Sequence, residues 1–480
     1  MKRRTALKNL GLGISAGMLA PQFFSACKKD DPGPEIRYNG NVIVIGAGAA
    51  GLYAADILRS KGISVTVLEA GTQPGGRVRS LRNQTDVQYH TFSSASQADF
   101  PVELGAEVIF GSNSSWGKVV SDFSLATVDM GASASPSYIL DGQAKSATGW
   151  QGDSDFQAVQ GFVSGLSNVG SNGSIKDAAN VSPRAQALLN SQAGNLFGSS
   201  AENISALGVA QMLKAQTHDS KQLTMRNNPW QDVLLSRFVN VLPLIKLNTE
   251  VKVIDWSGDV ITLTDAKGVQ HTCTKLIVAV PLSILKSGAI IFSPSLPSPN
   301  ANALSKFGMD ACIRLVLDFK KNFWGLDSSY IWGGTTVPQY FNSGAGRSQF
   351  FRTMSLTING PKAQQLSGLS DDNMVLQVLA EMDSIYNGQG TGFIRRDLTD
   401  DRILSLVKDW TKDPFIKGGI SYPLVGTTND DRKALASPAN DRLYFAGEAT
   451  DATGDAGTVS GALNSAIRVT DEIIKSIVNP

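Results

Sequence analysis

The sequence predicts an α/β fold: a Rossmann-like parallel sheet built from both ends of the chain, with a mixed α+β region inserted between them. Near the N-terminus, the β-branched run Asn41–Ile45 precedes a glycine-rich turn, a stretch of helical spacing, Leu52–Lys61, and a second strand, Ile63–Leu68. Near the C-terminus, a strand within Asp441–Glu448 and another glycine-rich turn precede a predicted helix, Ala462–Ile477.

The first turn, Gly46–Gly51, has the G-x-G-x-x-G spacing of a dinucleotide-binding βαβ unit. In such a unit, Gly46 permits the tight turn, Gly48 lets the backbone approach a pyrophosphate, and Gly51 lets the helix pack closely on the strand. Glu69 lies 18 residues after Gly51 and is expected to accept hydrogen bonds from both ribose hydroxyls. The predicted cofactor contacts of this unit are Gly46, Gly48, Ala50, Gly51, Glu69 and Ala70.

The segment Glu69–Ser80 resembles the E-x-x-x-x-x-G-G-R-x-x-[ST] signature of flavoproteins with two dinucleotide-binding domains. Gly75 and Gly76 would let the chain run beside the cofactor, and Arg77 would offer a planar fork to a phosphate. An arginine in this place also fits a surface salt bridge. A nicotinamide dehydrogenase does not need this segment, so the resemblance implies FAD.

The C-terminal segments Asp441–Glu448 and Gly454–Gly461 resemble the last part of the flavin-containing amine oxidases. That resemblance implies that Gly447 and Glu448 contact the ribityl–pyrophosphate part of FAD. It also places the turn Gly457–Thr458 at the flavin, with the backbone N–H of Val459 facing N1 and O2. Reduced flavin is negative at N1, and a helix N-terminus stabilises such a charge.

Further segments resemble the same family in the same order: Val102–Gly111, Leu247–Ile254, Lys275–Pro281, Trp410–Phe415 and Gly418–Tyr422. By this resemblance, Val251 would meet the adenine through its backbone and Trp410 would lie beside the flavin ring. The resemblance covers most of the chain and implies a division into domains. The FAD-binding domain would comprise residues 41–110, 242–297 and 423–480, and the substrate-binding domain residues 112–241 and 298–422.

The family resemblance also implies a reaction. Hydride would pass from an amine-bearing carbon to flavin N5, the imine would be hydrolysed, and dioxygen would be reduced to hydrogen peroxide. Another electron acceptor could replace dioxygen. Two other functions remain open. One is an FAD-dependent desaturase or dehydrogenase that acts on a non-amine substrate and shares both terminal motifs; the other is a flavin-binding protein without turnover.

The substrate side departs from the family pattern. Ser421 and Thr458 stand where monoamine oxidases have two tyrosines, and Val108 stands where L-amino acid oxidases have an arginine. Ile420 occupies the place of the covalent cysteine, so FAD is expected to be bound noncovalently. Glu107 is a candidate catalytic-site acid that would attract a cationic amine; a structural salt bridge is the equally weighted alternative.

Arg314 is the second candidate catalytic residue. It lies ten residues before Trp324, on a predicted strand Ile313–Phe319, where most of these oxidases have a lysine that holds a water at flavin N5. An arginine keeps the charge but cannot release a proton. It could stabilise developing superoxide, or pair with an acid such as Glu107 and slow the oxygen step. A third possibility is an exposed arginine on an edge strand.

Composition excludes several other functions. The chain has 43 basic and 42 acidic residues, so its net charge gives no electrostatic attraction for nucleic acid. Its histidines are expected on the solvated surface, and no group has metal-ligand spacing. Cys273, expected at the start of a strand, and Cys312 are expected to be buried free thiols. The histidines are His90, His218 and His271.

The first residues resemble an export signal. Arg3 and Arg4 precede an apolar stretch too short to span a bilayer, in the manner of a twin-arginine signal. Residues 24–27 resemble a bacterial lipobox, so residues 1–26 would be removed and Cys27 would carry lipid. Residues 27–40 would form a tether, and the protein would be anchored in the cell envelope, facing the periplasm or outside. A cleaved secretory signal with an incidental cysteine is the alternative.

Overall fold

The computed structural model describes residues 36–81, 102–325, 327–346 and 352–479. The predicted signal, Cys27, the tether up to residue 35 and His90 lie outside these ranges, so the expectations for them stay predictions.

The N-terminal βαβ unit belongs to a five-stranded sheet in which every neighbouring pair of strands is parallel. Its strands, in spatial order, are β10 (Ile245–Lys246), β2 (Ser64–Leu68), β1 (Asn41–Ile45), β14 (Lys275–Val278) and β23 (Leu443–Phe445). Strands from three distant parts of the chain thus form one sheet. Both faces of the sheet are covered, and strands buried on both faces have continuous apolar sequences such as that of β1.

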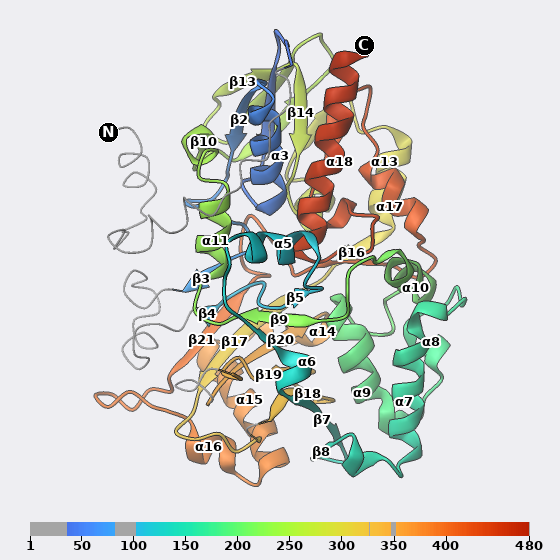
Figure 1. The fold of residues 1–480 in the computed structure, drawn as a ribbon, viewed down its shortest axis with the longest axis vertical. Helices are drawn as coiled ribbons and strands as arrows, with labels where there is room; N and C mark the ends of the chain where they lie inside the picture. Colours follow the sequence, from blue (N-terminus) through green and yellow to red (C-terminus); the bar gives the residue numbers. More distant parts are fainter. Residues whose placement is uncertain (1–35, 82–101, 326, 347–351, 480) are drawn as a thin grey trace.

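This sheet is the middle of three layers. Val42 and Val44 of β1 face the helices α3 (Ala49–Ser60) and α18 (Val459–Val478), which pack side by side in front of the sheet in Figure 1. Ile43 and Ile45 of the same strand pack against a four-stranded sheet on the other face. That sheet contains β13 (Gln270–Cys273), β12 (Ile261–Asp265), β11 (Val251–Asp255) and β15 (Ile291–Ser293).

Both helices begin three residues earlier than predicted. α3 starts at Ala49, inside the glycine motif, and α18 starts at Val459. The Thr458 side chain caps α18 by accepting a hydrogen bond from the backbone N–H of Gly461 at 3.1 Å. The first turn of each helix contains the last glycine of a predicted glycine-rich turn, Gly51 or Gly461, so these residues were assigned to the turn.

The inserted region contains a seven-stranded mixed sheet, at the lower end of Figure 1. Its strands, in spatial order, are β21 (Ser405–Asp409), β17 (Cys312–Asp318), β20 (Thr353–Asn359), β19 (Gln339–Phe341), β18 (Ser328–Trp332), β7 (Ser135–Leu140) and β8 (Gln143–Ser146). One face packs on two helices, α14 (Pro361–Ser367) and α15 (Asp371–Tyr386). The other face is directed toward the five-stranded sheet.

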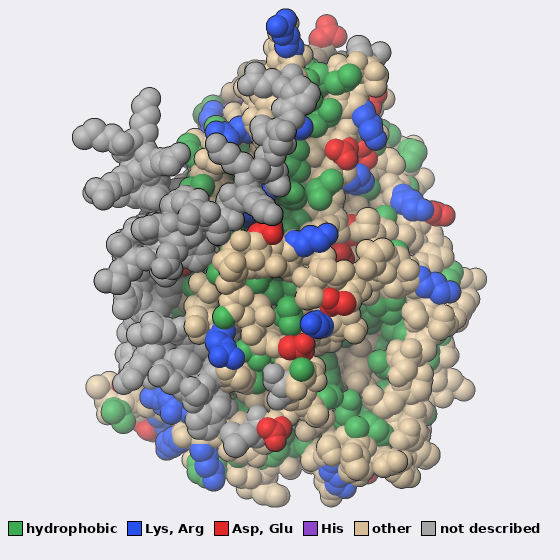
Figure 2. All heavy atoms as spheres, in the orientation of Figure 1, with side chains coloured by type: hydrophobic (Ala, Val, Ile, Leu, Met, Phe, Trp, Pro, Cys, Tyr) green, Lys and Arg blue, Asp and Glu red, His purple; other side chains and the backbone are tan. Residues whose placement is uncertain are grey.

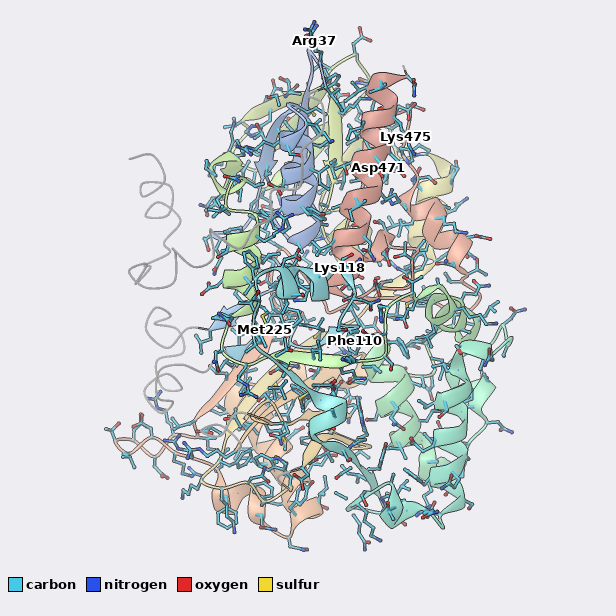
Figure 3. The ribbon with its side chains drawn as sticks, in the orientation of Figure 1. Arg37, Phe110, Lys118, Met225, Asp471 and Lys475 are labelled. Carbon is cyan, nitrogen blue, oxygen red and sulfur yellow. The ribbon has the colours of Figure 1, made fainter. Side chains whose placement is uncertain are left out.

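Smaller elements join the two large parts. The strands β5 (Ile109–Phe110), β9 (Gln222–Met225) and β6 (Thr127–Asp129) form a sheet between them, and Phe110 and Met225 mark its two ends in Figure 3. The pairs β3 (Ser80–Leu81) with β4 (Val102–Glu103) and β16 (Phe307–Met309) with β22 (Ser421–Pro423) also lie here. The principal remaining helices are α5 (Ser115–Asp122), α7 (Ser154–Gly165), α8 (Ile175–Ala179), α9 (Gln186–Leu189), α10 (Ala206–Ala215), α11 (Trp230–Arg237), α12 (Leu282–Lys286), α13 (Ser298–Ser305), α16 (Gln389–Phe393) and α17 (Asn429–Ala436).

Charged side chains of both signs are scattered over the face shown in Figure 2, with no large area of one sign. Lys118 of α5 and the neighbouring Asp471 and Lys475 of α18 illustrate this mixture in Figure 3. Among the described residues, no helix is both long and apolar enough to cross a bilayer. Within the same ranges, no group of three or more His, Cys, Asp or Glu side chains is arranged to hold a metal.

Candidate functional site

A cavity of about 630 Å³ lies between the five-stranded and the seven-stranded sheets. Its walls collect nearly all the residues that the sequence predicted to bind FAD. The predicted cofactor residues in its lining are Gly46, Gly48, Ala50, Glu69, Ala70, Gly75, Gly76, Arg77, Val251, Trp410, Gly447, Glu448, Gly457, Thr458 and Val459. Gly51 does not line the cavity, which agrees with its predicted role in helix packing.

The surroundings of Gly48 and Gly51 in the glycine-rich turn show why each position has no side chain. A Cβ at Gly51 would stand 2.0 Å from the carbonyl oxygen of Gly46, so only glycine lets α3 approach the strand this closely. A Cβ at Gly48 would meet no atom within 4 Å, because Gly48 faces the open cavity. That open space beside bare backbone fits the close approach of a pyrophosphate.

Two helix N-termini point into the same cavity. α3 begins after Gly48 with no side-chain cap, and α18 begins at Val459. The first residues of both helices line the cavity. Backbone N–H groups of a first turn have no partner within their helix and carry partial positive charge. These donors fit the diphosphate and the electron-rich end of a flavin, so the residues present fit FAD.

Glu69 is already engaged by its own turn. Its carboxylate oxygens accept hydrogen bonds from the backbone N–H groups of Ala47 and Gly71, each at 2.7 Å. Burial raises the pKa of Glu69, although the two N–H groups act in the opposite direction. Each oxygen retains a lone pair for a ribose hydroxyl. Glu69 therefore shapes the turn in addition to the predicted ribose contact.

Arg77 and Glu448, predicted to contact different parts of FAD, bind each other. Arg77 Nη1 donates to Glu448 Oε1 at 2.9 Å and to the carbonyl oxygen of Gly419 at 2.6 Å. Glu448 also accepts from Ser421 Oγ at 2.6 Å and from the N–H of Gly457 at 2.9 Å. Burial alone would raise the pKa of Glu448, but the charge and hydrogen bond of Arg77, the hydrogen bond from Ser421 and the charge of Arg432 outweigh it and lower the pKa.

Arg432 is a buried site residue that the sequence did not indicate. Its Nη1 donates to the carbonyl oxygen of Ala449 at 2.7 Å and lies 3.3 Å from Ser421 Oγ. Burial lowers the pKa of Arg432 to about 10, against the attraction of Glu448 and Asp451. On the sequence, Arg432 is one charged residue in a charged helix, and only the fold turns it inward.

Trp410 is fixed against another predicted segment. Its indole Nε1 donates to the carbonyl oxygen of Leu104 at 2.8 Å, and its backbone N–H donates to the carbonyl oxygen of Cys312 at 2.9 Å. A Cβ at Gly105 would stand 1.8 Å from the carbonyl oxygen of Arg77 and 3.4 Å from the Trp410 ring. The segments around residues 77, 104 and 410 therefore meet at one wall of the cavity.

Arg314 and Glu107 form a buried ion pair in the cavity wall. Arg314 Nη2 donates to Glu107 Oε2, and Ser355 Oγ donates to the same oxygen at 2.8 Å. Arg314 Nη1 also donates to Thr357 Oγ1. Burial lowers the pKa of Arg314 to about 10. Of the outcomes expected for Arg314, the structure has the pairing with Glu107.

The expectation of an exposed arginine on an edge strand is wrong. β17 lies between β21 and β20, and Arg314 is 6% exposed. The sequence periodicity marked the strand but carried no information about its neighbours. The residues paired with Arg314 are Thr357 and Lys408, 43 and 94 positions away.

The expectation for the histidines is also wrong for two of them. His218 Nε2 lies 2.9 Å from Asp455 Oδ1, and His271 Nε2 lies 3.2 Å from Asp265 Oδ2; each imidazole side chain is 10% exposed. His218 lines the cavity. Their polar sequence neighbours suggested solvent, but the fold brings Asp455 to His218 from the other end of the chain and pairs His271 with Asp265 across neighbouring strands. The burial of Cys273 and Cys312 as free thiols is confirmed, although Cys273 ends strand β13 and does not begin one.

The sequence did not indicate several uncharged polar residues of the lining, among them Asn195, Gln339, Thr357 and Asn359. Asn195 donates through Nδ2 to the carbonyl oxygen of Thr357 at 3.0 Å and approaches Gln339 Oε1 at 3.5 Å. Asn359 donates through Nδ2 to the carbonyl oxygen of Asn195 at 2.8 Å. The polar–apolar alternation of Thr353–Asn359 was a signal that could have indicated Thr357 and Asn359.

Sequence comparison identifies the family. Residues 244–474 match the family described as flavin containing amine oxidoreductase, and residues 44–123 match the NAD(P)-binding Rossmann-like domain. Nearly half of the chain, residues 244–474, thus matches the flavin-containing amine oxidase family. The predicted family, the α/β fold and the cofactor, FAD, are thereby confirmed, and the family is one of oxidoreductases.

The matched curated relatives are longer proteins. Lysine-specific histone demethylase 1 homolog 1 of Arabidopsis thaliana is 25% identical over 463 residues, which cover 91% of this chain and 52% of that protein. Human lysine-specific histone demethylase 2 is 25% identical, covering 92% of this chain and 54% of its own. The chain therefore spans about half the length of these relatives.

Two solved amine oxidases share the fold over nearly their full lengths. A cofactor-binding redesign of putrescine oxidase superimposes with a TM-score of 0.74 at 17% identity, covering 91% of this chain and 99% of that one. Cyclohexylamine oxidase from Brevibacterium oxydans also gives a TM-score of 0.74 at 17% identity, covering 92% and 100%. At this identity, the likeness concerns the fold.

Proposed function

We propose that this protein is an FAD-dependent oxidase that converts an amine to an imine, which water hydrolyses, while dioxygen takes up the electrons as hydrogen peroxide. The observation that supports the proposal is the single cavity shared by the two helix N-termini, the Arg77–Glu448 pair and Arg314. When bound, FAD supplies the hydride acceptor, and the protein supplies binding, orientation and charge stabilisation.

Each part of the site has a role in this proposal. The N-termini of α3 and α18 hold the negative groups of the cofactor. Arg77 and Glu448 hold the turn that ends at Gly457, and Val251 accommodates the adenine. Ile420 lines the cavity with an aliphatic side chain, which supports noncovalent attachment. The amine must lose its ammonium proton before hydride leaves, so the rate rises with pH through the pKa of the bound amine.

The Arg314–Glu107 pair favours a second candidate, a dehydrogenase that uses another electron acceptor. The pair holds the Arg314 guanidinium against a carboxylate, and the hydroxyl groups of Thr357 and Ser355 accept further hydrogen bonds from it. An arginine held in this way is less available to stabilise developing superoxide. Rapid mixing of the reduced enzyme with dioxygen distinguishes the two candidates, because a dehydrogenase reoxidises slowly with dioxygen and quickly with an artificial acceptor.

The central experiment is a search for amines that bleach the flavin. The purified protein is expected to be yellow, to release FAD on heating and to leave no flavin on the peptide that contains Ile420. Monoamines, polyamines and amino acids are then added without dioxygen, and absorbance of the oxidised flavin is followed. A folded protein that refuses FAD contradicts the proposal, as does a flavin that no amine reduces.

We also propose that the protein is exported by the twin-arginine route and anchored by lipid on Cys27. The motif at residues 24–27 supports this, and a bacterial lipoprotein has the multiple acyl chains that stable anchoring requires. Cys27→Ser is expected to move the protein from the membrane fraction to the soluble fraction. Continued sedimentation of that variant with membranes contradicts the lipid anchor.

A further inference from the structure

The sheet that forms the lower wall of the cavity has two chemically different faces. Along β17 and β20, alternate side chains such as Ile313, Leu315, Leu356 and Ile358 enter the apolar core beneath the sheet. Their neighbours point the other way, because successive strand residues face opposite sides. The side chains that reach the cavity from this sheet are Cys312, Arg314, Gln339, Thr357 and Asn359.

Three of these residues form a row across the strands. Thr357 of β20 is the register partner of Arg314 on β17 and of Gln339 on β19. Side chains directly opposite in an antiparallel pair are close enough to act together. Asn359 lies two residues beyond Thr357 on the same face, so the row and Asn359 form one continuous polar surface.

The only charge among these five side chains is neutralised. Arg314 is paired with Glu107 and donates to Thr357 Oγ1 and Ser355 Oγ. A substrate that brings a second cation, or a carboxylate, would find no opposite charge without a partner on this wall. Burying such a charge without a counter-charge is unfavourable.

The wall has two further hydrogen-bonding groups, both uncharged: one donor and one acceptor. Among the described residues, Gln339 Nε2 and Asn359 Oδ1 have no hydrogen-bond partner, although both residues line the cavity. Asn359 Oδ1 lies 2.9 Å from where a Cβ at Gly419 would stand, so the glycine leaves this oxygen uncovered. The wall therefore offers one amide donor and one amide acceptor to a bound molecule.

We infer that Gln339 and Asn359 are specificity-determining residues, and that the substrate is an amine carrying a neutral hydrogen-bonding group such as a hydroxyl or carboxamide. This inference rests on the proposed amine oxidation and narrows its substrate class. A diamine or an amino acid is disfavoured because its second charge has no partner on this wall. A site that hydrogen-bonds a substrate group rejects analogues that lack the group.

The test uses one ring with one changing substituent. Cyclohexylamines that carry hydrogen, hydroxyl, carboxamide, ammonium or carboxylate opposite the amine are compared by kcat/KM for anaerobic flavin reduction. The hydroxyl and carboxamide compounds are expected to exceed cyclohexylamine by roughly tenfold, as one hydrogen bond supplies. The ammonium and carboxylate compounds are expected to fall below cyclohexylamine. Equal rates, or a preference for ammonium or carboxylate, overturn the inference.

Variants locate the effect. Gln339→Leu and Asn359→Leu are each expected to lower the hydroxyl-to-hydrogen ratio by roughly tenfold. Gln339→Glu keeps the shape but adds a negative charge, so it is expected to shift preference toward the ammonium compound. Gln364→Leu, on the exposed side of α14, is the matched control and keeps the parent ratio. An unchanged ratio in all three cavity variants overturns the inference.

A binding measurement separates this inference from the proposed function. The corresponding cyclohexanes without an amine are added to the FAD-loaded protein, and the melting temperature and visible flavin spectrum are recorded. Stabilisation by the carboxamide and hydroxyl compounds, lost in Gln339→Leu, supports the polar wall even if no amine reduces the flavin. Amine reduction without any such preference supports the oxidase and contradicts the polar wall.

Discussion

The two walls of the cavity are built in different ways. On the cofactor side, the contacts come from short motifs such as Gly46–Gly51 and Gly454–Gly461, in which neighbours in sequence are neighbours in space. On the substrate side, Arg314, Thr357 and Gln339 come from three strands whose pairing brings them into one row. The glycine motifs of the first wall act through their own backbone, with the Arg77–Glu448 pair as a long-range exception, whereas side chains on the second wall depend on one another.

The largest expected effect tests this dependence. Arg314→Met leaves Glu107 buried without its partner and is expected to lower the free energy of unfolding by about 3–5 kcal/mol. The double variant Arg314→Met/Glu107→Gln removes both charges and is expected to recover much of that loss. Urea unfolding of the two single variants and the double variant gives the coupling energy. Additive losses would contradict an interdependent substrate wall.

The second prediction tests the local character of the cofactor wall. Gly51→Ala places a Cβ 2.0 Å from the Gly46 carbonyl oxygen and is expected to cost about 3 kcal/mol of stability. The matched control is Gly161→Ala, because Gly161 lies inside helix α7 with no atom within 4 Å of its Cβ position. That control is expected to stabilise the protein by about 1 kcal/mol or less. Equal unfolding midpoints in the two variants would show that α3 does not depend on the close approach.

A third, smaller effect concerns cofactor affinity. Glu69→Ala removes an acceptor of both the turn N–H groups and the ribose hydroxyls, and is expected to cost about 1–3 kcal/mol of FAD affinity. Titration of the apoprotein with FAD, followed by flavin fluorescence, measures the change. Glu202→Ala, whose side chain is 62% exposed, serves as the control and should bind FAD like the parent. Unchanged FAD affinity in Glu69→Ala would show that Glu69 makes no stabilising contact with the ribose.

The smallest expected effect is a pH dependence of stability. The folded-state pKa of Glu448 lies below the ordinary value of 4.5, so folding favours its charged form. Its contribution is therefore present above pH 4.5 and is lost as the pH falls through the folded-state pKa. Unfolding free energies measured from about pH 6 down to about pH 3 should fall more steeply in the parent than in Glu448→Gln. Parallel pH profiles would contradict the ion pair with Arg77.

The sequence alone determined the cofactor half of this protein. The spacing of Gly46, Gly48 and Gly51, the acid at position 69 and the glycine turn before α18 indicated the sheet, the helices and a dinucleotide. The resemblance of Glu69–Ser80 to a flavoprotein signature indicated FAD. These features can be recognised in the sequence because each acts on the backbone beside it. A glycine permits a close approach of two backbone segments, and a glycine-rich turn is followed directly by the N-terminus of a helix. The strand β1 was predicted with the bounds that the structure has.

The tertiary structure alone decided the substrate half. Nothing in the spacing of Glu107 and Arg314 distinguishes a free acid and an exposed arginine from a buried ion pair; that depends on which strands lie beside β17. The same holds for His218, which Asp455 meets from the other end of the chain, and for Gln339 and Asn359. Such contacts arise when long-range strand pairing places distant side chains together, and local periodicity records which face a side chain takes but not its partner.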